Sequence, residues 1–330
     1  MSEAPTSATA TAGVRVRPLT LADREAAASL LDDDPGYGLF PRSNLIHLGR
    51  GLSLARYWGA FTGSRLTALA MDVSGRVALY APVGSDVSPL LEIVAPSTRF
   101  TMGRPDLVDA LLGAVPPAAT IQREEHMLAA VEVGLTSPPG PLRSALAPAA
   151  QGDALLLGPD GPRAVVPHEE RGSTERSWQA VVRRATLLDV PALTELYVGS
   201  AGFEDADPDA VRRTVAGRVR SLRTFLAETE GRVVAAASST GETPRAAMVG
   251  GVWTAPHARN RGYASAVVAA LTSDLCDVGL RPYLFYLREN APAARVYARI
   301  GYREVGAWSV ATIAPGPEPT REVPGSDAHE

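Results

Sequence analysis

Apolar and polar residues follow a helical period in the segment from residue 205 to residue 223. Apolar side chains recur every three or four positions, and arginines occupy much of the remainder. This spacing places the apolar residues on one stripe, so the segment predicts an amphipathic helix with a basic outer surface. The stripe consists of Val211, Val215, Val219 and Leu222, and the arginines are Arg212, Arg213, Arg218, Arg220 and Arg223.

Short apolar runs and a second helical stripe fill the rest of the C-terminal half. The stripe predicts a helix that starts near Ala264, and a later short helix ends at Gly301. The run that begins at residue 246 carries no charge, as expected of a central strand. The order β-α-α-β-β-β-α-β-α-β predicts a mixed α/β fold, with a short strand at the start of 180–197 and further strands at 224–228, 232–240, 246–253, 282–287 and 302–313.

The N-terminal half begins in the same way as the C-terminal half. Residues 14–31 and 180–197 each give a short strand, a threonine and then an aspartate, Asp23 or Asp189, near the start of an amphipathic helix. We therefore expect two domains built on one plan. A helix is predicted after Gly103, and strands are predicted at Tyr57–Phe61, Arg65–Met71, Val77–Ala81 and Met127–Val133.

Turn-forming residues and low apolar content mark the expected boundaries. The resulting division gives a disordered leader at 1–12, an N-terminal domain at 13–150, a linker at 151–177, a C-terminal domain at 178–313 and a disordered tail at 314–330. The turn-rich region between the domains also has apolar bursts that are compatible with a hairpin.

Composition excludes several classes of protein. The net charge of −4 gives no general case for nucleic acid or an acidic membrane surface. All basic residues other than histidine are arginines, so lysine Schiff-base and P-loop chemistry are absent. The single cysteine, Cys276, permits no internal disulfide, and the five histidines show no metal spacing. With no secretory signal or bilayer-length apolar run, we expect a soluble cytoplasmic protein without a metal.

One loop has the composition of a phosphate-binding site. The uncharged strand at 246–253 leads through a proline into "RNRGYA", Arg259 to Ala264, where Gly262 opens a helix. Unpaired amides at a helix start, a close backbone approach at glycine, and two arginines together suit a pyrophosphate. The alternative from the loop alone is an ordinary helix start with solvated arginines.

The loop and its surroundings strongly resemble the GNAT family of acyl-CoA N-acyltransferases. The family's loop has the pattern Gln/Arg-x-x-Gly-x-Gly/Ala, and "VWTAP" before it and "RENAPAARVYARIGYREVG" after it also match. The resemblance covers about residues 180–313. It implies two GNAT-like domains, each a mixed, mostly antiparallel twisted sheet flanked by helices. The N-terminal half lacks the loop, so the arrangement looks like a degenerate domain joined to a working one.

The resemblance also assigns expected roles to particular residues. The amides of Arg259, Asn260, Arg261, Gly262, Tyr263 and Ala264 would hold the pyrophosphate of the donor, and Val252, Trp253 and Thr254 would border its pantetheine arm. Asn290 would contact the pantetheine or sulfur region, although "ENAPAAR" equally suits a helix N-cap. Tyr297 would protonate the departing thiolate. Its alternative is a half-buried core tyrosine, and Cys276 is not expected to be a nucleophile.

The base that takes the proton from the amine is not evident. Many family members carry a glutamate on the strand before the loop, but "AAMVGGVW" has no carboxylate. Glu204 or Asp205, in the acidic turn 202–209, could accept the proton or attract a cationic acceptor, and the alternative is a solvated loop. Glu242 and Tyr286 are weaker candidates, and a weakly basic amine would need no base.

The expected function is transfer of an acyl group, with acetyl from acetyl-CoA first, to an amine through a tetrahedral intermediate. One alternative donor is a phosphopantetheine thioester on an acyl carrier protein, which the arginine face of 212–223 would dock. A second alternative is a non-catalytic acyl-CoA-binding protein. The acceptor, a small molecule or a peptide, and the oligomeric state are left open, as is the role of the N-terminal half beyond completing the acceptor cleft or an interface.

Overall fold

The computed structural model describes most of both halves and part of the connection between them. The described residues are 13–48, 55–117, 119–132, 156–158, 161–167, 179–200 and 202–314, with backbone only for 156–158, 161–167 and 179. The expected leader at 1–12, nearly all of the expected tail and most of the expected linker lie outside these ranges. Among the described residues, no helix is long and apolar enough to cross a membrane.

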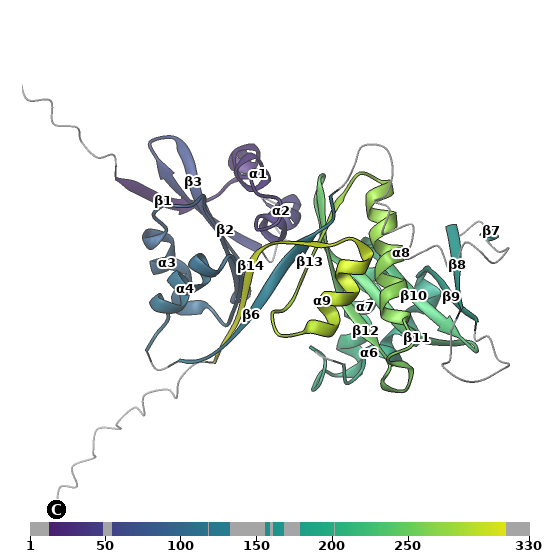
Figure 1. The fold of residues 1–330 in the computed structure, drawn as a ribbon. Coiled ribbons are helices and arrows are strands. Elements are labelled where there is room, and N and C mark those ends of the chain that lie inside the picture. The colour runs from purple at the N-terminus through teal and green to yellow at the C-terminus, as the bar shows by residue number, and fades with distance from the viewer. Residues whose placement is uncertain are drawn as a thin grey trace, which may run out of the picture.

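A single twisted sheet runs through the whole molecule (Figure 1). Its order is β1-β2-β3-β4-β5-β14-β6-β13-β12-β11-β10-β9-β8-β7. All neighbours are antiparallel except β4 with β5 and β12 with β13. The strands are β1 Val14–Pro18, β2 Ala55–Thr62, β3 Arg65–Val73, β4 Arg76–Tyr80, β5 Phe100–Gly103, β6 Thr120–Ala130, β7 Leu156–Gly158, β8 Gly161–Pro167, β9 Gln179–Arg184, β10 Thr224–Thr229, β11 Arg232–Glu242, β12 Ala246–Thr254, β13 Arg281–Leu287 and β14 Arg303–Ala314.

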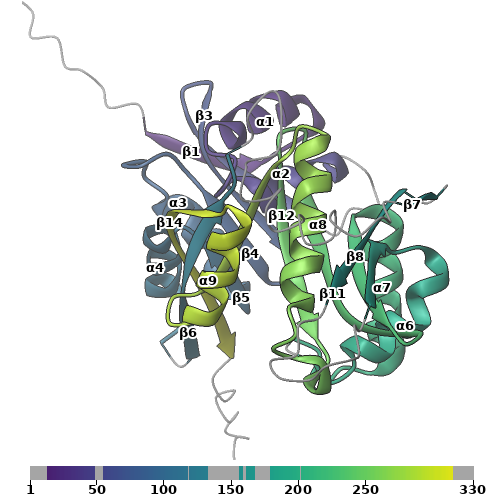
Figure 2. The same ribbon diagram turned by 45° about the vertical axis from the view of Figure 1, so that its right-hand side comes forward.

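Helices cover both faces of this sheet in each half. On one face lie α1 and α2 in the N-terminal half and α6 and α7 in the C-terminal half, whereas α3, α4, α8 and α9 lie on the other face (Figure 2). The predicted mixed, mostly antiparallel fold is therefore confirmed. The helices are α1 Arg24–Asp32, α2 Leu39–Asn44, α3 Ser88–Val94, α4 Pro105–Ala114, α6 Val190–Tyr197, α7 Pro208–Ser221, α8 Tyr263–Asp277 and α9 Ala291–Ile300.

The two halves begin with the same hydrogen-bonded turn. Asp23 accepts from the guanidinium of Arg17 at 2.7 Å and from the amide of Thr20 at 2.8 Å. Asp189 makes the equivalent contacts with Arg183, at 2.6 Å, and with Thr186, at 2.8 Å. Both aspartates thus stand at a helix start, as their sequence position predicts.

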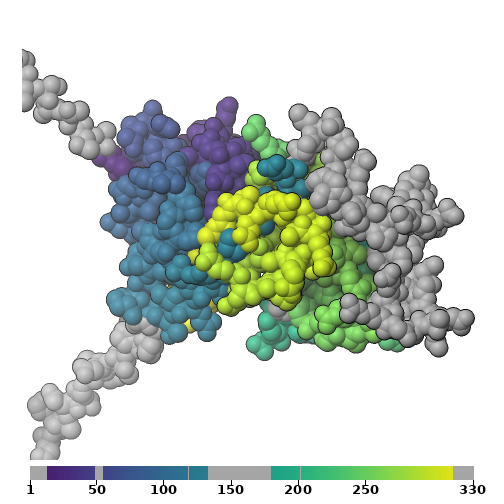
Figure 3. All heavy atoms as spheres, viewed as in Figure 1, coloured from purple at the N-terminus to yellow at the C-terminus, as the bar shows by residue number. Residues whose placement is uncertain are grey.

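The last strand of each half lies within the sheet of the other half. β14 is inserted between β5 and β6, and β6 is inserted between β14 and β13. Figure 3 shows the C-terminal segment, in yellow, seated against the blue N-terminal half and the green C-terminal half. The helix α2 also contacts β11 and β12, so the N-terminal half covers part of the C-terminal sheet.

Candidate functional site

The parallel strands β12 and β13 separate after a short stretch of pairing. Their ladder joins Ala246–Met248 to Arg281–Tyr283, and β12 then continues to Thr254 without a described partner on that side. β13 remains paired along its length to β6 on its other edge. Since an unpaired strand edge presents free amides and carbonyls, this part of β12 can bind an extended chain of alternating polar and apolar groups.

A β-bulge on the other edge of β12 lies at the same level. Ala236 of β11 pairs with Trp253 and Ser238 pairs with Gly250, so β12 has one residue more than β11 between these pairs. Gly251, inside the bulge, has a φ of +56°, and its carbonyl accepts a hydrogen bond from the hydroxyl of Tyr197. Because a bulge bends its strand and increases the local twist, it directs β12 away from β13.

The loop after β12 opens the helix α8 with a group of free amides. Asn260 has a φ of +62°, and Gly262, the N-cap, has a φ of +82° with no heavy atom within 4 Å of the position that a Cβ would occupy. Within the described residues, no group accepts a hydrogen bond from the amides of 262–265. Free amides together with the positive end of a helix dipole are a combination that can bind an anion.

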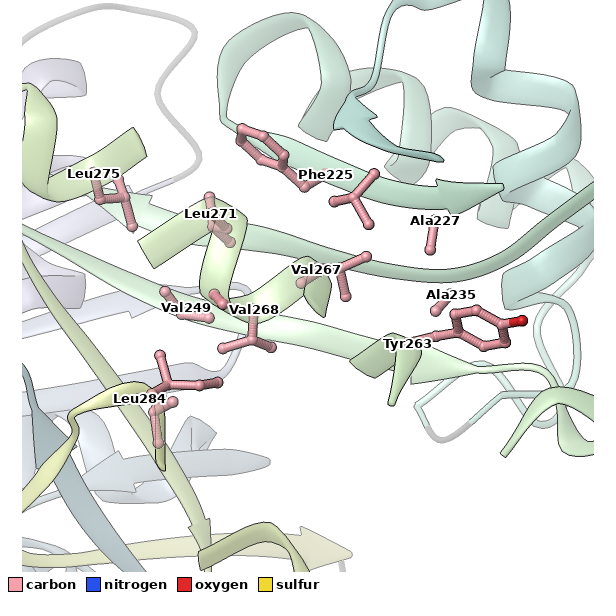
Figure 4. Close-up of a cluster of buried hydrophobic side chains, with 14 of the residues drawn as sticks. Phe225, Ala227, Ala235, Val249, Tyr263, Val267, Val268, Leu271, Leu275 and Leu284 are labelled. Atoms are coloured by element: carbon pink, nitrogen blue, oxygen red, sulfur yellow. The ribbon is translucent and has the colours of Figure 1, made fainter. Parts of the chain in front are cut away.

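The side chain of Tyr263 fixes this helix start on the sheet. It is 3% exposed and packs with the apolar side of α8 against β10–β12, as Figure 4 shows for Tyr263, Val267 and Leu271 opposite Phe225 and Ala235. Tyr263 therefore takes part in the expected loop through its amide, whereas its ring belongs to the core.

The two arginines of the loop are placed differently from one another. The Nε of Arg259 donates to the carbonyl of Thr254 at 3.3 Å, and its guanidinium lies 4.9 Å from the ring of Trp253. Arg259 is thus held over the end of β12, close to the strand residues expected at the donor. Arg261 is exposed at the helix start.

The helix α9 follows β13, as α8 follows β12, and the two helices lie side by side on one face of the sheet. Asn290 is the N-cap of α9, and its side-chain oxygen accepts from the amide of Ala293 at 3.1 Å. The capping role is therefore present, and the exposed side chain stands at the start of the helix.

Tyr297 is part of a tyrosine cluster. Its ring lies 5.5 Å from that of Tyr286 and 6.0 Å from that of Tyr302. In the part of the chain that the structure describes, its hydroxyl has no hydrogen-bond partner, whereas Tyr302 pairs with Thr272. Burial raises the pKa of Tyr297, so the phenol is protonated at neutral pH and can donate a proton.

The acidic candidates lie in other surroundings. Glu204 and Asp205 are exposed in the turn between α6 and α7, where the Glu204 carboxylate accepts from the amide of Gly202 at 2.8 Å. Glu242 is bound to Arg223 and to the hydroxyl of Ser239, and Tyr286 donates to Glu304 at 2.7 Å. Both are therefore engaged in structural contacts. Burial raises the pKa of Cys276 to about 11, which keeps its thiol protonated and unreactive at neutral pH.

The N-terminal half has a similar strand separation but a different helix start. β4 pairs with β5 only at Arg76–Val77, and the following helix α3 has Val87 as N-cap and Pro89 in its first turn. Proline supplies no amide, so this start offers fewer donors to an anion. A separate cavity of about 240 Å³ lies in this half, lined by Phe40, Asn44, Met71, Val73, Arg76, Val77, Ala78, Phe100 and Met102.

Two features of the site escape sequence reasoning. The first is the bulge at Gly251, for which "GG" inside an apolar strand was an available signal. The second is Arg218 of α7, whose Nη1 would lie 3.1 Å from a Cβ on Gly251. The helical pattern in the sequence does not distinguish Arg218 from the other arginines of α7.

Comparisons with known proteins identify similar folds. Residues 228–310 match the model of the family described as FR47-like protein. No curated protein matches the chain at a significant level. A Drosophila protein from structural genomics is similar at a TM-score of 0.60 and 12% identity, covering 92% of this chain and 99% of that one. At 12% identity the likeness shows a shared fold.

Two further solved structures share the fold at 12% identity. A tandem GNAT protein from the clavulanic acid biosynthesis pathway matches with a TM-score of 0.54, and the match covers 92% of this chain and 98% of that chain. A GNAT-family acetyltransferase from Colwellia psychrerythraea has a TM-score of 0.51, with 91% and 99% covered. Nearly the whole chain, and not the C-terminal half alone, therefore follows this fold.

Proposed function

We propose that this chain is an N-acyltransferase of the GNAT superfamily, because residues 228–310 match the FR47-like family model and nearly the whole chain shares the fold of a tandem GNAT protein. Its C-terminal half would move an acyl group, acetyl in the first instance, from a CoA thioester to an amine. The observation that supports this most is the set of amides at 262–265, which no described group engages, beside an edge of β12 that pairs with no described strand.

The donor would bind along two elements that meet at Thr254. Its pyrophosphate would accept from the amides of 259–264, and its pantetheine arm would lie along the free edge of Val252, Trp253 and Thr254. Hydrogen bonds to a charged group contribute about 1.5–3 kcal/mol each, against about 0.3–1 kcal/mol for the helix dipole at an exposed position. Affinity would therefore depend mainly on the amides and on Arg261.

The reaction would proceed by direct attack. The nitrogen of a neutral amine bonds to the thioester carbon, the tetrahedral intermediate collapses, and the carbon–sulfur bond breaks. The thiolate takes its proton from the neutral phenol of Tyr297, while Asn290 would stand near the pantetheine end of the donor. The amine's surplus proton would pass to water, since Glu204 and Asp205 lie in an exposed turn.

A carrier-protein donor is the second candidate, favoured by one surface. Arg212, Arg213 and Arg220 are exposed on α7 and form no ion pair with any described residue. Such a face suits an acidic protein that presents the same phosphopantetheine arm. The third candidate is a non-catalytic protein that would bind acyl-CoA at the same site without transferring the acyl group.

Release of free thiol separates these readings. The full chain is mixed with acetyl-CoA and a panel of primary amines, and then with an acetylated carrier protein. Thiol release that depends on both acetyl-CoA and amine supports the proposal. Release only from the carrier thioester supports the second candidate. Tight CoA binding without release from either donor would contradict an enzymatic function.

A further inference from the structure

Arg218 is a partly buried cation without a counter-charge among the residues that the structure describes. Its Nη1 is fully buried and has no hydrogen-bond partner, and no described carboxylate lies within ion-pair distance of it. Two other partly buried arginines of this half have carboxylate partners, since Arg183 binds Asp189 and Glu228, and Arg223 binds Glu242 and Asp274. The third, Arg281, donates to the carbonyl of Val131 at 3.3 Å. Desolvating a charge without a partner is costly, so an unpaired guanidinium here points to an anion from outside the chain.

The guanidinium is held in place by aromatic rings and the bulge of β12. Its carbon lies 6.0 Å from the ring centre of Tyr197 and 5.6 Å from that of Phe203. A Cβ on Gly251 would be 3.1 Å from Nη1, so the cation lies directly against the backbone of the bulge. Arg218 therefore stands where β12 leaves β13, on the face opposite to α8 and α9.

The neighbouring polar groups do not neutralise this charge. The hydroxyl of Tyr197 donates to the carbonyl of Gly251, and burial raises the pKa of Tyr197 to about 12, so it remains a neutral phenol. In the same turn as Phe203, the hydroxyl of Ser200 is buried and also lacks a hydrogen-bond partner, with the residue 1% exposed. Among the described residues, a cation against the bulge and a hydroxyl in the turn after α6 are thus both left without partners.

We infer that Arg218 binds a carboxylate of the substrate at the bulge of β12. A guanidinium presents two parallel donors that match the two oxygens of a carboxylate, which neither an ammonium nor a phenol does. The inference rests on the proposed acyl transfer and narrows its substrate class. The carboxylate belongs either to the amine acceptor, as in an amino acid, or to the acyl group of a dicarboxylic acyl-CoA.

Matched substrates test the acceptor first. Glycine, L-alanine, L-phenylalanine and L-lysine are each compared with their amides, with acetyl-CoA as the donor. The wild-type protein is expected to prefer the acid of at least one pair in kcat/KM by about 10- to 100-fold, the worth of one charge-assisted hydrogen bond. In Arg218→Gln the preference falls to about one, mainly through KM.

The donor arm and two variants complete the test. Succinyl-CoA is compared with butyryl-CoA on the amides, and a preference for succinyl-CoA that Arg218→Gln removes places the carboxylate on the acyl group. Arg245→Gln, at an exposed position in the turn between β11 and β12, is the control and keeps either preference. Arg218→Lys retains the charge but lacks the two parallel donors of the guanidinium, so it restores the preference only in part.

Two outcomes would overturn the inference. One is an equal loss of kcat with acids and amides in Arg218→Gln, which would make Arg218 a general stabiliser of the reaction. The other is the absence of any carboxylate preference in both arms.

A melting experiment keeps the inference separate from the proposed function. With CoA present, N-acetyl derivatives of the same four amino acids should raise the melting temperature of the wild type more than their amides do, and this difference should vanish in Arg218→Gln. If no amine releases thiol, the proposed transfer fails and this difference alone decides on Arg218. No difference for any of the four derivatives, and none between succinyl-CoA and butyryl-CoA in the same scans, would refute the carboxylate site. The same scans report whether Arg218→Gln is folded.

Discussion

At the scale of single residues, the site is defined by which polar groups have partners. The hydroxyl of Tyr302 forms a hydrogen bond with Thr272, and the hydroxyl of Tyr286 donates to Glu304. Tyr297, between these two rings, has a hydroxyl that no described group engages. The cluster therefore holds the Tyr297 ring rigidly and leaves its proton available for transfer.

Replacing Tyr297 by phenylalanine should lower kcat by about 100-fold and leave CoA affinity unchanged. A proton donor contributes to the transition state and not to ground-state binding, and general acids typically supply about 10²–10⁴-fold. Steady-state kinetics and calorimetry with CoA measure the two effects. Tyr302→Phe, the control, should lower stability without this change in kcat. Equal losses of kcat and CoA affinity in Tyr297→Phe would make Tyr297 structural.

The pKa of Tyr297 also predicts the pH profile. Burial raises this pKa above its ordinary value of about 10, and the protonated phenol is the form that donates. Activity should therefore rise with pH as the amine loses its proton, and it should not fall before about pH 10. A decline near pH 8 in the wild type that Tyr297→Phe lacks would disprove this assignment of the acid.

At the scale of elements, both ends of α8 are set by left-handed glycines. Gly262 at its start has a φ of +82° and Gly279 just after its end has a φ of +78°, and neither has a heavy atom within 4 Å of a Cβ position. An alanine at either place suffers the same backbone strain, about 1–2 kcal/mol. The two substitutions should therefore lower stability by similar amounts. They differ in that only Gly262 adjoins the proposed donor site.

Elements were predictable from the sequence where their apolar pattern is strong. The stripe of α8, the N-cap at Asn290 and the glycine stop at Gly301 all follow from local chemistry. The first part of β6, from Thr120 to Glu125, was missed because its side chains are exposed and its order comes from pairing with β14. The position of Arg218 at the bulge depends on how α7 docks, which no local pattern encodes.

At the scale of the whole molecule, the exchange of β6 and β14 joins the two halves. Trp308 on β14 is 1% exposed, and its ring stacks on Phe285 of β13 at 5.2 Å and on Tyr37 of the N-terminal half at 5.8 Å. The aromatic cluster therefore includes contributions from both halves. The repeat seen in the sequence predicts two similar plans, but it contains no information on which strand completes which sheet.

This exchange predicts that neither half folds alone. A fragment of residues 13–132 would lack β14, and β6 would lose both of its neighbours, while a fragment of residues 179–314 would lack β6. Expressed separately, both fragments should be unfolded or aggregated by circular dichroism and gel filtration. Expressed together, they should purify as one folded complex. A monomeric, cooperatively melting fragment of either half would refute the coupling.

The most direct test of the donor site is calorimetric binding of CoA to the wild type, Gly262→Ala and Gly279→Ala. Melting curves should show similar losses of stability in the two variants, because the strain is the same. Gly279→Ala should bind CoA as the wild type does. Gly262→Ala should bind CoA at least about tenfold more weakly, because the strained backbone displaces the amides that would donate to the pyrophosphate. Wild-type affinity for CoA in a folded Gly262→Ala protein would contradict the account.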